Sequence, residues 1–99
     1  MVIRIRDDAD RRYAADPRWS NAEEHEKSIG VSIISKITGG EFPVLSTDHD
    51  KEMDVTFYNI LIRPKFKAHT QWGVPMVIGA AFIPSDYVQV VRPGFWEAR

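Results

Sequence analysis

The stretch FIPSDYV at residues 82–88 decides the fold predicted for this chain. Its Phe-Ile pair favours a strand, and Pro84 ends regular ladder pairing because proline has a fixed φ and no backbone N–H. The Ser-Asp pair that follows has short side chains that bond the nearby backbone and favour a tight turn. A second strand then begins at Tyr87 and runs to Val91. The stretch therefore predicts two strands joined by a short turn, with Pro84 and Tyr87 presenting one apolar face.

Several short runs before this turn predict further strands at a spacing of about ten residues. VTFYNILIR at residues 55–63 is the longest apolar run, and we expect it to form the main core strand and to end at Pro64. Residues 66–72 and 76–83 predict two more strands, and residues 2–5 predict a short one. Such spacing is typical of a small barrel or sandwich. The predicted fold class is therefore mainly β: a small barrel-like antiparallel sheet domain with an N-terminal helix.

The helix is predicted to begin at Ser20 or Asn21, where a capping box fits, and to end near Ile29 with Gly30 after it. Residues 31–38 allow two interpretations. As a strand, they would pair with residues 41–45 across Gly39 and Gly40, because two glycines suit the positive φ values of a type I′ hairpin turn. As a helix, residues 21–38 would form one long element and the fold would be α+β. The hairpin is the preferred interpretation.

Length and composition indicate one small domain. The chain has 99 residues, 43% apolar residues, a formal net charge of −1 and no cysteine. This composition supports one core, excludes disulfides and gives no general attraction to nucleic acid. We expect a cytoplasmic protein without a membrane segment, divided into an N-terminal strand and helical arm (1–30), a barrel-like core (31–91) and a tail (92–99).

The residues 83–88, IPSDYV, resemble the last turn of Src-homology-3 domains. Trp72 lies twelve residues before Pro84, about where that family places its groove tryptophan, and residues 54–57, DVTF, are similar to one of its strand starts. The resemblance covers about residues 42–91 and implies a small β-barrel with a groove for proline-rich peptides. The family's first aromatic motif is missing near residues 43–48, and Gly73 replaces its second tryptophan. The barrel is therefore better supported than the proline-rich ligand.

The sequence indicates no catalytic or metal site and no cofactor. His25, His49 and His69 are scattered, without the spacing of a metal motif. Gly39 and Gly40 form a turn signal and no phosphate-binding loop. We therefore expect a protein that is not an enzyme.

Three groups of residues are candidates for partner binding. Trp72, Pro84 and Tyr87 are expected to form one contact face, since exposed aromatic residues often anchor interfaces. An acidic loop at residues 46–54 would form a rim that selects a basic partner. That rim consists of Asp48, Asp50 and Glu52. In the tail, Phe95 and Trp96 would either fold back on the barrel or contact a partner or a second copy.

The basic stretch RPKFK at residues 63–67 has cations interleaved with a phenylalanine, which can suit single-stranded nucleic acid. The overall charge argues against that use, and an ordinary inward-facing Phe66 is the preferred interpretation.

The function predicted from these features is non-catalytic protein–protein interaction, with another protein, basic or proline-rich, as the partner. The alternative is a structural subunit of a homo-oligomeric assembly, such as a phage-type virion joint or tail component. In that alternative, the strand at residues 2–5 and the aromatic tail would pair with neighbouring copies.

Overall fold

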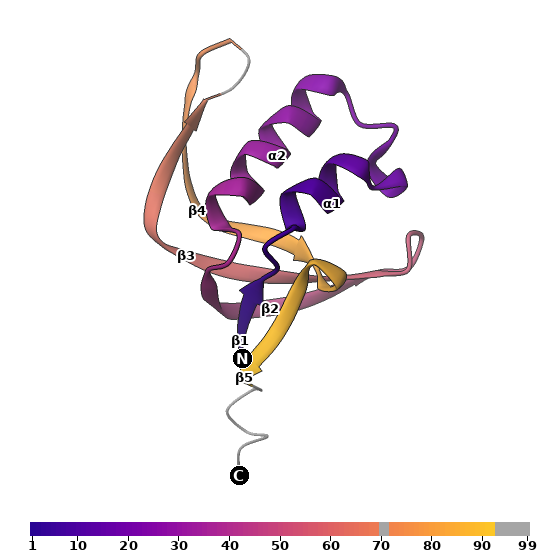
Figure 1. The fold of residues 1–99 in the computed structure, drawn as a ribbon, viewed down its shortest axis with the longest axis vertical. Helices are drawn as coiled ribbons and strands as arrows, with labels where there is room; N and C mark the ends of the chain where they lie inside the picture. Colours follow the sequence, from indigo (N-terminus) through magenta and orange to yellow (C-terminus); the bar gives the residue numbers. More distant parts are fainter. Residues whose placement is uncertain (70–71, 93–99) are drawn as a thin grey trace.

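The computed structural model describes residues 1–69 and 72–92, except for the side chain of His25. Its strands form one open antiparallel sheet in the order β4-β3-β2-β1-β5, with both helices on the same side (Figure 1). The mainly β, antiparallel fold class is confirmed. The expected tail contacts Phe95 and Trp96 lie outside the described residues. The elements are β1 (Val2–Ile5), α1 (Ala9–Ala15), the 3-10 helix η1 (Pro17–Trp19), α2 (Glu24–Ile37), β2 (Glu41–Asp50), β3 (Val55–His69), β4 (Pro75–Pro84), the 3-10 helix η2 (Ser85–Tyr87) and β5 (Val88–Arg92).

The core lies between α2 and the sheet and is built mostly from isoleucine. Its largest fully buried side chains come from β1, β3 and η2, and each buried isoleucine stabilises the fold by about 1.5–3 kcal/mol relative to an exposed one. Helix α2 adds two residues from its inner face. These core residues are Ile3, Ile5, Ile34, Ile37, Ile60, Ile62, Ile83 and Tyr87.

The hairpin predicted across Gly39 and Gly40 is wrong, because residues 24–37 form one continuous helix. Ile34 and Ile37 recur on the face that packs into the core, and this tertiary burial outweighs the strand propensity of β-branched residues. Gly39 has φ +76° and follows the helix, as a helix-ending glycine does. The boundary expected at residues 30/31, between the N-terminal arm and the barrel-like core of the single domain, therefore falls inside α2.

Gly30 lies in the middle of α2 and does not end a helix as predicted. A Cβ placed there would lie 2.5 Å from Tyr13 Oη and 2.7 Å from its Cζ. The absent side chain thus lets the Tyr13 ring of α1 lie directly on α2. Close approach of the two helices explains a glycine at a position where alanine has the better helix propensity.

Two expected strand limits are also corrected. β2 continues through residues 46–50, so the predicted acidic loop shrinks to the turn at residues 51–54. β3 does not end at Pro64 but continues to His69, and its pairing with β4 shifts register between Leu61 and Phe66. The proline is accommodated within this irregular stretch of the ladder.

β1 is an inner strand, paired with β2 on one side and β5 on the other. It is therefore not free to pair with a neighbouring copy, which corrects the expected use of residues 2–5. The edges of the sheet are β4 and β5, and η2 connects these two strands directly.

We predict that Gly30→Ala destabilises the protein by about 1–3 kcal/mol, because the new methyl group overpacks the α1–α2 contact. The free energy of unfolding from urea titration measures this. In a Tyr13→Ala background the same change should instead stabilise by about 0.5–1 kcal/mol through helix propensity. Destabilisation of equal size in both backgrounds would contradict the packing explanation.

Candidate functional site

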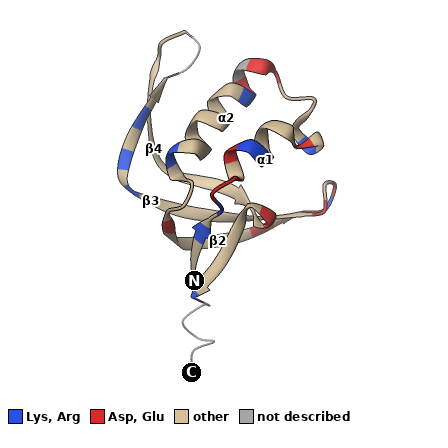
Figure 2. Cartoon of the chain, viewed as in Figure 1, with Lys and Arg blue, Asp and Glu red and all other residues tan. Residues whose placement is uncertain are grey.

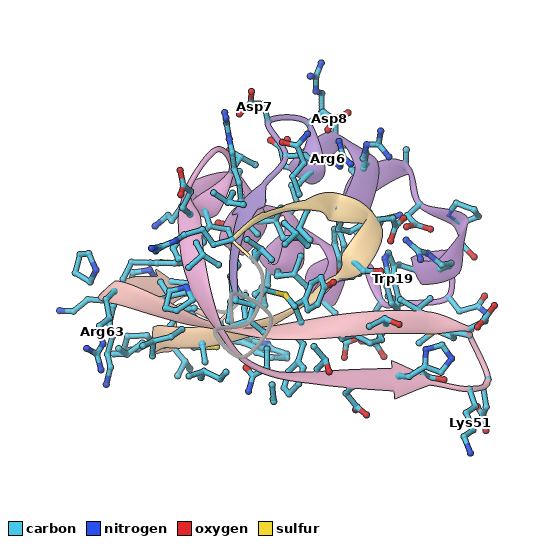
Figure 3. The ribbon with its side chains drawn as sticks, turned by 90° about the horizontal axis from the view of Figure 1, so that it is seen from below. Arg6, Asp7, Asp8, Trp19, Lys51 and Arg63 are labelled. Carbon is cyan, nitrogen blue, oxygen red and sulfur yellow. The ribbon has the colours of Figure 1, made fainter. Side chains whose placement is uncertain are left out.

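The most connected polar cluster joins η1 to η2, which are about 70 residues apart in sequence. The buried Tyr87 hydroxyl donates a short hydrogen bond to Asp16 Oδ2. The same hydroxyl accepts a hydrogen bond from Trp19 Nε1 at 3.1 Å. In Figure 3, Trp19 lies between η1 and the sheet. This cluster therefore ties the segment before α2 to the turn between the two edge strands.

Arg18 completes the cluster, which we call the clasp (Asp16, Arg18, Trp19, Asp86 and Tyr87). One guanidinium nitrogen lies 2.6 Å from Asp16 Oδ2 and 2.8 Å from Asp86 Oδ2. The guanidinium carbon is 5.7 Å from the ring centroids of both Trp19 and Tyr87, within cation–π range. Arg18 is thus neutralised by two carboxylates and covered by two aromatic rings.

The clasp shifts the pKa values of its members. Hydrogen bonds from Arg18 and Tyr87 hold the pKa of Asp16 well below its usual 3.8 and outweigh the effect of burial. Burial and the Asp16 contact raise the pKa of Tyr87 to about 12. Both shifts favour a charged Asp16 beside a neutral Tyr87 at neutral pH. The clasp is thus a closed structural unit whose polar groups bind one another.

The contact face predicted from Trp72, Pro84 and Tyr87 is not formed. Tyr87 is 1% exposed and Pro84 is buried, whereas Trp72 is 74% exposed. Trp72 lies in the connection between β3 and β4, while Pro84 pairs with Phe57 at the other end of this hairpin. The turn was predicted correctly. Its tyrosine, Tyr87, is nevertheless buried in the core, because η2 lies between the edge strands β4 and β5 and packs this side chain inward.

A polar hollow of about 280 Å³ lies beside the segment between β1 and α1. Arg4, Arg6, Asp7 and Asp8 line it, and Figure 3 labels the last three. Two ion pairs lie at this hollow: Arg4 is 3.3 Å from Asp7, and Arg12 is 3.0 Å from Asp8. Arg6 forms no ion pair among the described residues, and its buried Nε has no hydrogen-bond partner there. The acids of the hollow are therefore neutralised, and Arg6 is left with an unsatisfied donor.

A second hollow, of about 420 Å³, lies between the C-terminal turn of α2 and β3. Its floor is apolar and its rim carries two cations. The Lys36 ammonium lies 5.2 Å from the centroid of the Phe66 ring and donates a hydrogen bond to the Lys67 carbonyl oxygen at 3.1 Å. We call this hollow the basic groove; its residues are Lys36, Ile37, Phe42, Ile62, Arg63, Pro64 and Phe66.

The two cations of the basic groove, Lys36 and Arg63, have no carboxylate partner among the described residues. Lys65 and Lys67 follow Arg63 at alternate positions of β3, and neither forms an ion pair in this part of the chain. Figure 2 shows the resulting basic stretch on β3 and the end of α2. As preferred from the sequence, Phe66 packs against the core, yet its ring also forms part of the groove.

Acidic residues gather at the opposite end of the sheet, on β2 and the β2–β3 turn (Figure 2). Asp48 and Glu52 are exposed and Asp50 is partly exposed, as the predicted acidic rim requires. Asp50 Oδ1 accepts hydrogen bonds from the backbone N–H groups of Glu52 (2.9 Å) and Met53 (3.1 Å). The structure therefore brings the three acidic candidates together, but far from Trp72.

The remaining candidates are placed as follows. His49 contacts Thr56 and Asp54 on the exposed surface, and His69 is exposed at the end of β3. In the described part of the chain, no three His, Asp or Glu side chains are close enough to hold a metal ion. Neither helix there is long and apolar enough to cross a bilayer.

Comparison of the chain with protein family models, with curated proteins and with solved structures gives no significant match. The functional assignment therefore rests on the geometry and charge of the residues themselves.

We predict that Asp16→Asn makes the free energy of unfolding less dependent on pH at acidic pH. Because the folded state lowers the pKa of Asp16, its stabilisation is complete above the unfolded pKa of 3.8 and is lost as pH falls through the folded pKa. Urea titrations of wild type should therefore show stability declining below about pH 5, and the variant should decline less.

The matched control is Asp8→Asn, which removes a carboxylate from the exposed pair with Arg12. Arg12 also lowers the pKa of Asp8, but solvent screens this exposed pair, so the variant should reduce the acid loss of stability much less than Asp16→Asn does. An equal reduction by both variants would contradict the role given to the clasp.

Proposed function

We propose that this chain is a non-catalytic protein-interaction module whose binding surface is the basic groove. Its ligand would be an acidic protein segment that carries one apolar side chain between carboxylates. The observation that carries the proposal is the coincidence of an apolar floor with rim cations that have no carboxylate partner within the described chain.

Three arginines outside the groove are neutralised within the chain, since Arg4, Arg12 and Arg18 each lie within 3.3 Å of a carboxylate. Lys36 and Arg63 form no such pair among the described residues. What distinguishes them from the other cations without an ion pair there is the apolar floor that they flank. Those other cations are Arg6, Arg11, Lys27, Lys51, Lys65, Lys67 and Arg92. Complementary charge across an interface speeds encounter and selects the partner, while the buried apolar contact supplies most of the affinity.

The shape of the groove favours a carboxylate-bearing peptide over nucleic acid. Binding of single strands needs exposed aromatic faces along a charged track. Here the Phe66 ring is partly buried, and the Lys36 ammonium lies near its face. The formal net charge of −1 also opposes a polyanion. A proline-rich ligand is disfavoured because the aromatic face that it would need is not formed.

A structural subunit of a homo-oligomeric assembly is the second candidate. The observation that favours it is the uneven distribution of charge, with a run of cations on β3 and a group of carboxylates at the β2–β3 turn (Figure 2). The basic surface of one copy can bind the acidic surface of a second copy, which is a heterologous interface.

Titration of the isotope-labelled chain with the peptide Glu-Glu-Leu-Glu-Glu, followed by NMR, tests the proposal. We expect chemical-shift changes at the end of α2 and in the middle of β3. The double variant Lys36→Glu/Arg63→Glu should lose them, because it places like charges opposite the ligand.

The control variant Arg11→Glu/Arg92→Glu makes the same charge change at two exposed cations outside the groove, and it should retain binding. Lys-Lys-Leu-Lys-Lys, a proline-rich peptide and single-stranded DNA serve as competing ligands. Stronger groove binding by any of these three than by the acidic peptide would overturn the proposed ligand chemistry. An absence of shifts with all four would overturn the groove as a binding surface.

A further inference from the structure

We infer that the basic groove binds the acidic turn of a second copy of this chain. The acidic turn is the segment at residues 50–54, in which Asp50, Glu52 and Asp54 surround Met53 and outnumber the one cation, Lys51. In the contact, Met53 enters the apolar floor while the carboxylates face Lys36 and Arg63. The inference rests on the proposed function, because it names the occupant of the same groove.

The acidic turn presents Met53 in an ordered conformation. Asp50 Oδ1 accepts hydrogen bonds from the backbone N–H groups of Glu52 and Met53, and Asp54 has φ +52°. The Asp54 side chain is 91% exposed and lies 3.3 Å from His49 Nε2. Met53 is 39% exposed between these acids, although it is a large apolar residue. A preorganised turn loses little conformational entropy on binding.

The groove and the turn are complementary in both charge and shape. The turn has an apolar side chain flanked by Glu52 and Asp54, and the groove has an apolar floor flanked by two cations. A methionine side chain is flexible and polarisable, so it adapts to an irregular apolar hollow. The groove volume of about 420 Å³ leaves room for it without rearrangement of the floor.

The two surfaces of one chain cannot meet each other. Asp54 and Arg63 are separated by nine positions along β3, which at about 3.3 Å per residue corresponds to about 30 Å of strand. Figure 3 places Lys51 of the turn and Arg63 of the groove at opposite ends of the sheet. The contact must therefore form between copies, either reciprocally in a dimer or head to tail in a larger assembly.

Sedimentation velocity of the full chain over a wide concentration range tests the inference. We expect wild type to self-associate. The turn variant Glu52→Lys/Met53→Ala and the groove variant Lys36→Glu/Arg63→Glu should each weaken association by about tenfold or more. An equimolar mixture of the two variants should restore a heterodimer, because one intact turn then meets one intact groove.

The controls are Glu26→Lys for the turn and Arg11→Glu/Arg92→Glu for the groove, and both should associate as wild type does. Circular dichroism confirms that every variant is folded. Association that survives in both the turn and the groove variants would overturn the inference and point to another surface, such as the β4 edge.

A wild-type chain that stays monomeric at millimolar concentration would also overturn the inference. If such a monomer still binds Glu-Glu-Leu-Glu-Glu in its groove, the proposed function stands and only the second copy is excluded as the ligand. If it binds no acidic peptide, both proposals fail.

Discussion

The hydrogen bond from the buried Tyr87 hydroxyl to Asp16 fixes the arrangement on which the rest of the structure depends. Tyr87 lies in the short link between the two edge strands, and Asp16 lies between the helices. A hydroxyl buried without a partner would cost about 1–3 kcal/mol, so the two segments are held together as the core forms. Asp16 in turn binds Arg18, and Arg18 binds Asp86. The charges on this side of the molecule are thereby satisfied within the chain.

Among the described residues, the cations on β3 and at the end of α2 have no carboxylate partner. The nearest dense group of acids along β3 is the β2–β3 turn, at the other end of the sheet. The strand between them pairs with β2 over residues 55–60 and with β4 over residues 57–61, which keeps the two groups apart. The proposed binding of an acidic partner rests on these cations and on the apolar hollow beside them.

Local chemistry allowed much of the sheet to be predicted from sequence. The strands near residues 55–63, 76–83 and 87–91 and the turn after Pro84 follow from apolar runs and proline positions. The errors arose where tertiary packing overrides local preference: Ile34 and Ile37 keep α2 helical, and β3 continues past Pro64. The clasp was missed because its hydrogen bond joins residues 71 positions apart, and nothing in one sequence pairs them. The basic cluster at residues 63–67 was identified in the sequence. The groove beside it could not be predicted, because it is formed by the packing of α2 against β3.

The ionic-strength dependence of self-association tests the central claim most directly, since no substitution is needed. Charges that dock across an interface attract over about 30 Å at 0.01 M salt and only about 3 Å at 1 M. If unpaired charges of the groove meet those of the turn, the association constant from sedimentation equilibrium should fall steadily as salt rises between these limits. An association constant that stays level or rises with salt would contradict the account and indicate a purely apolar contact.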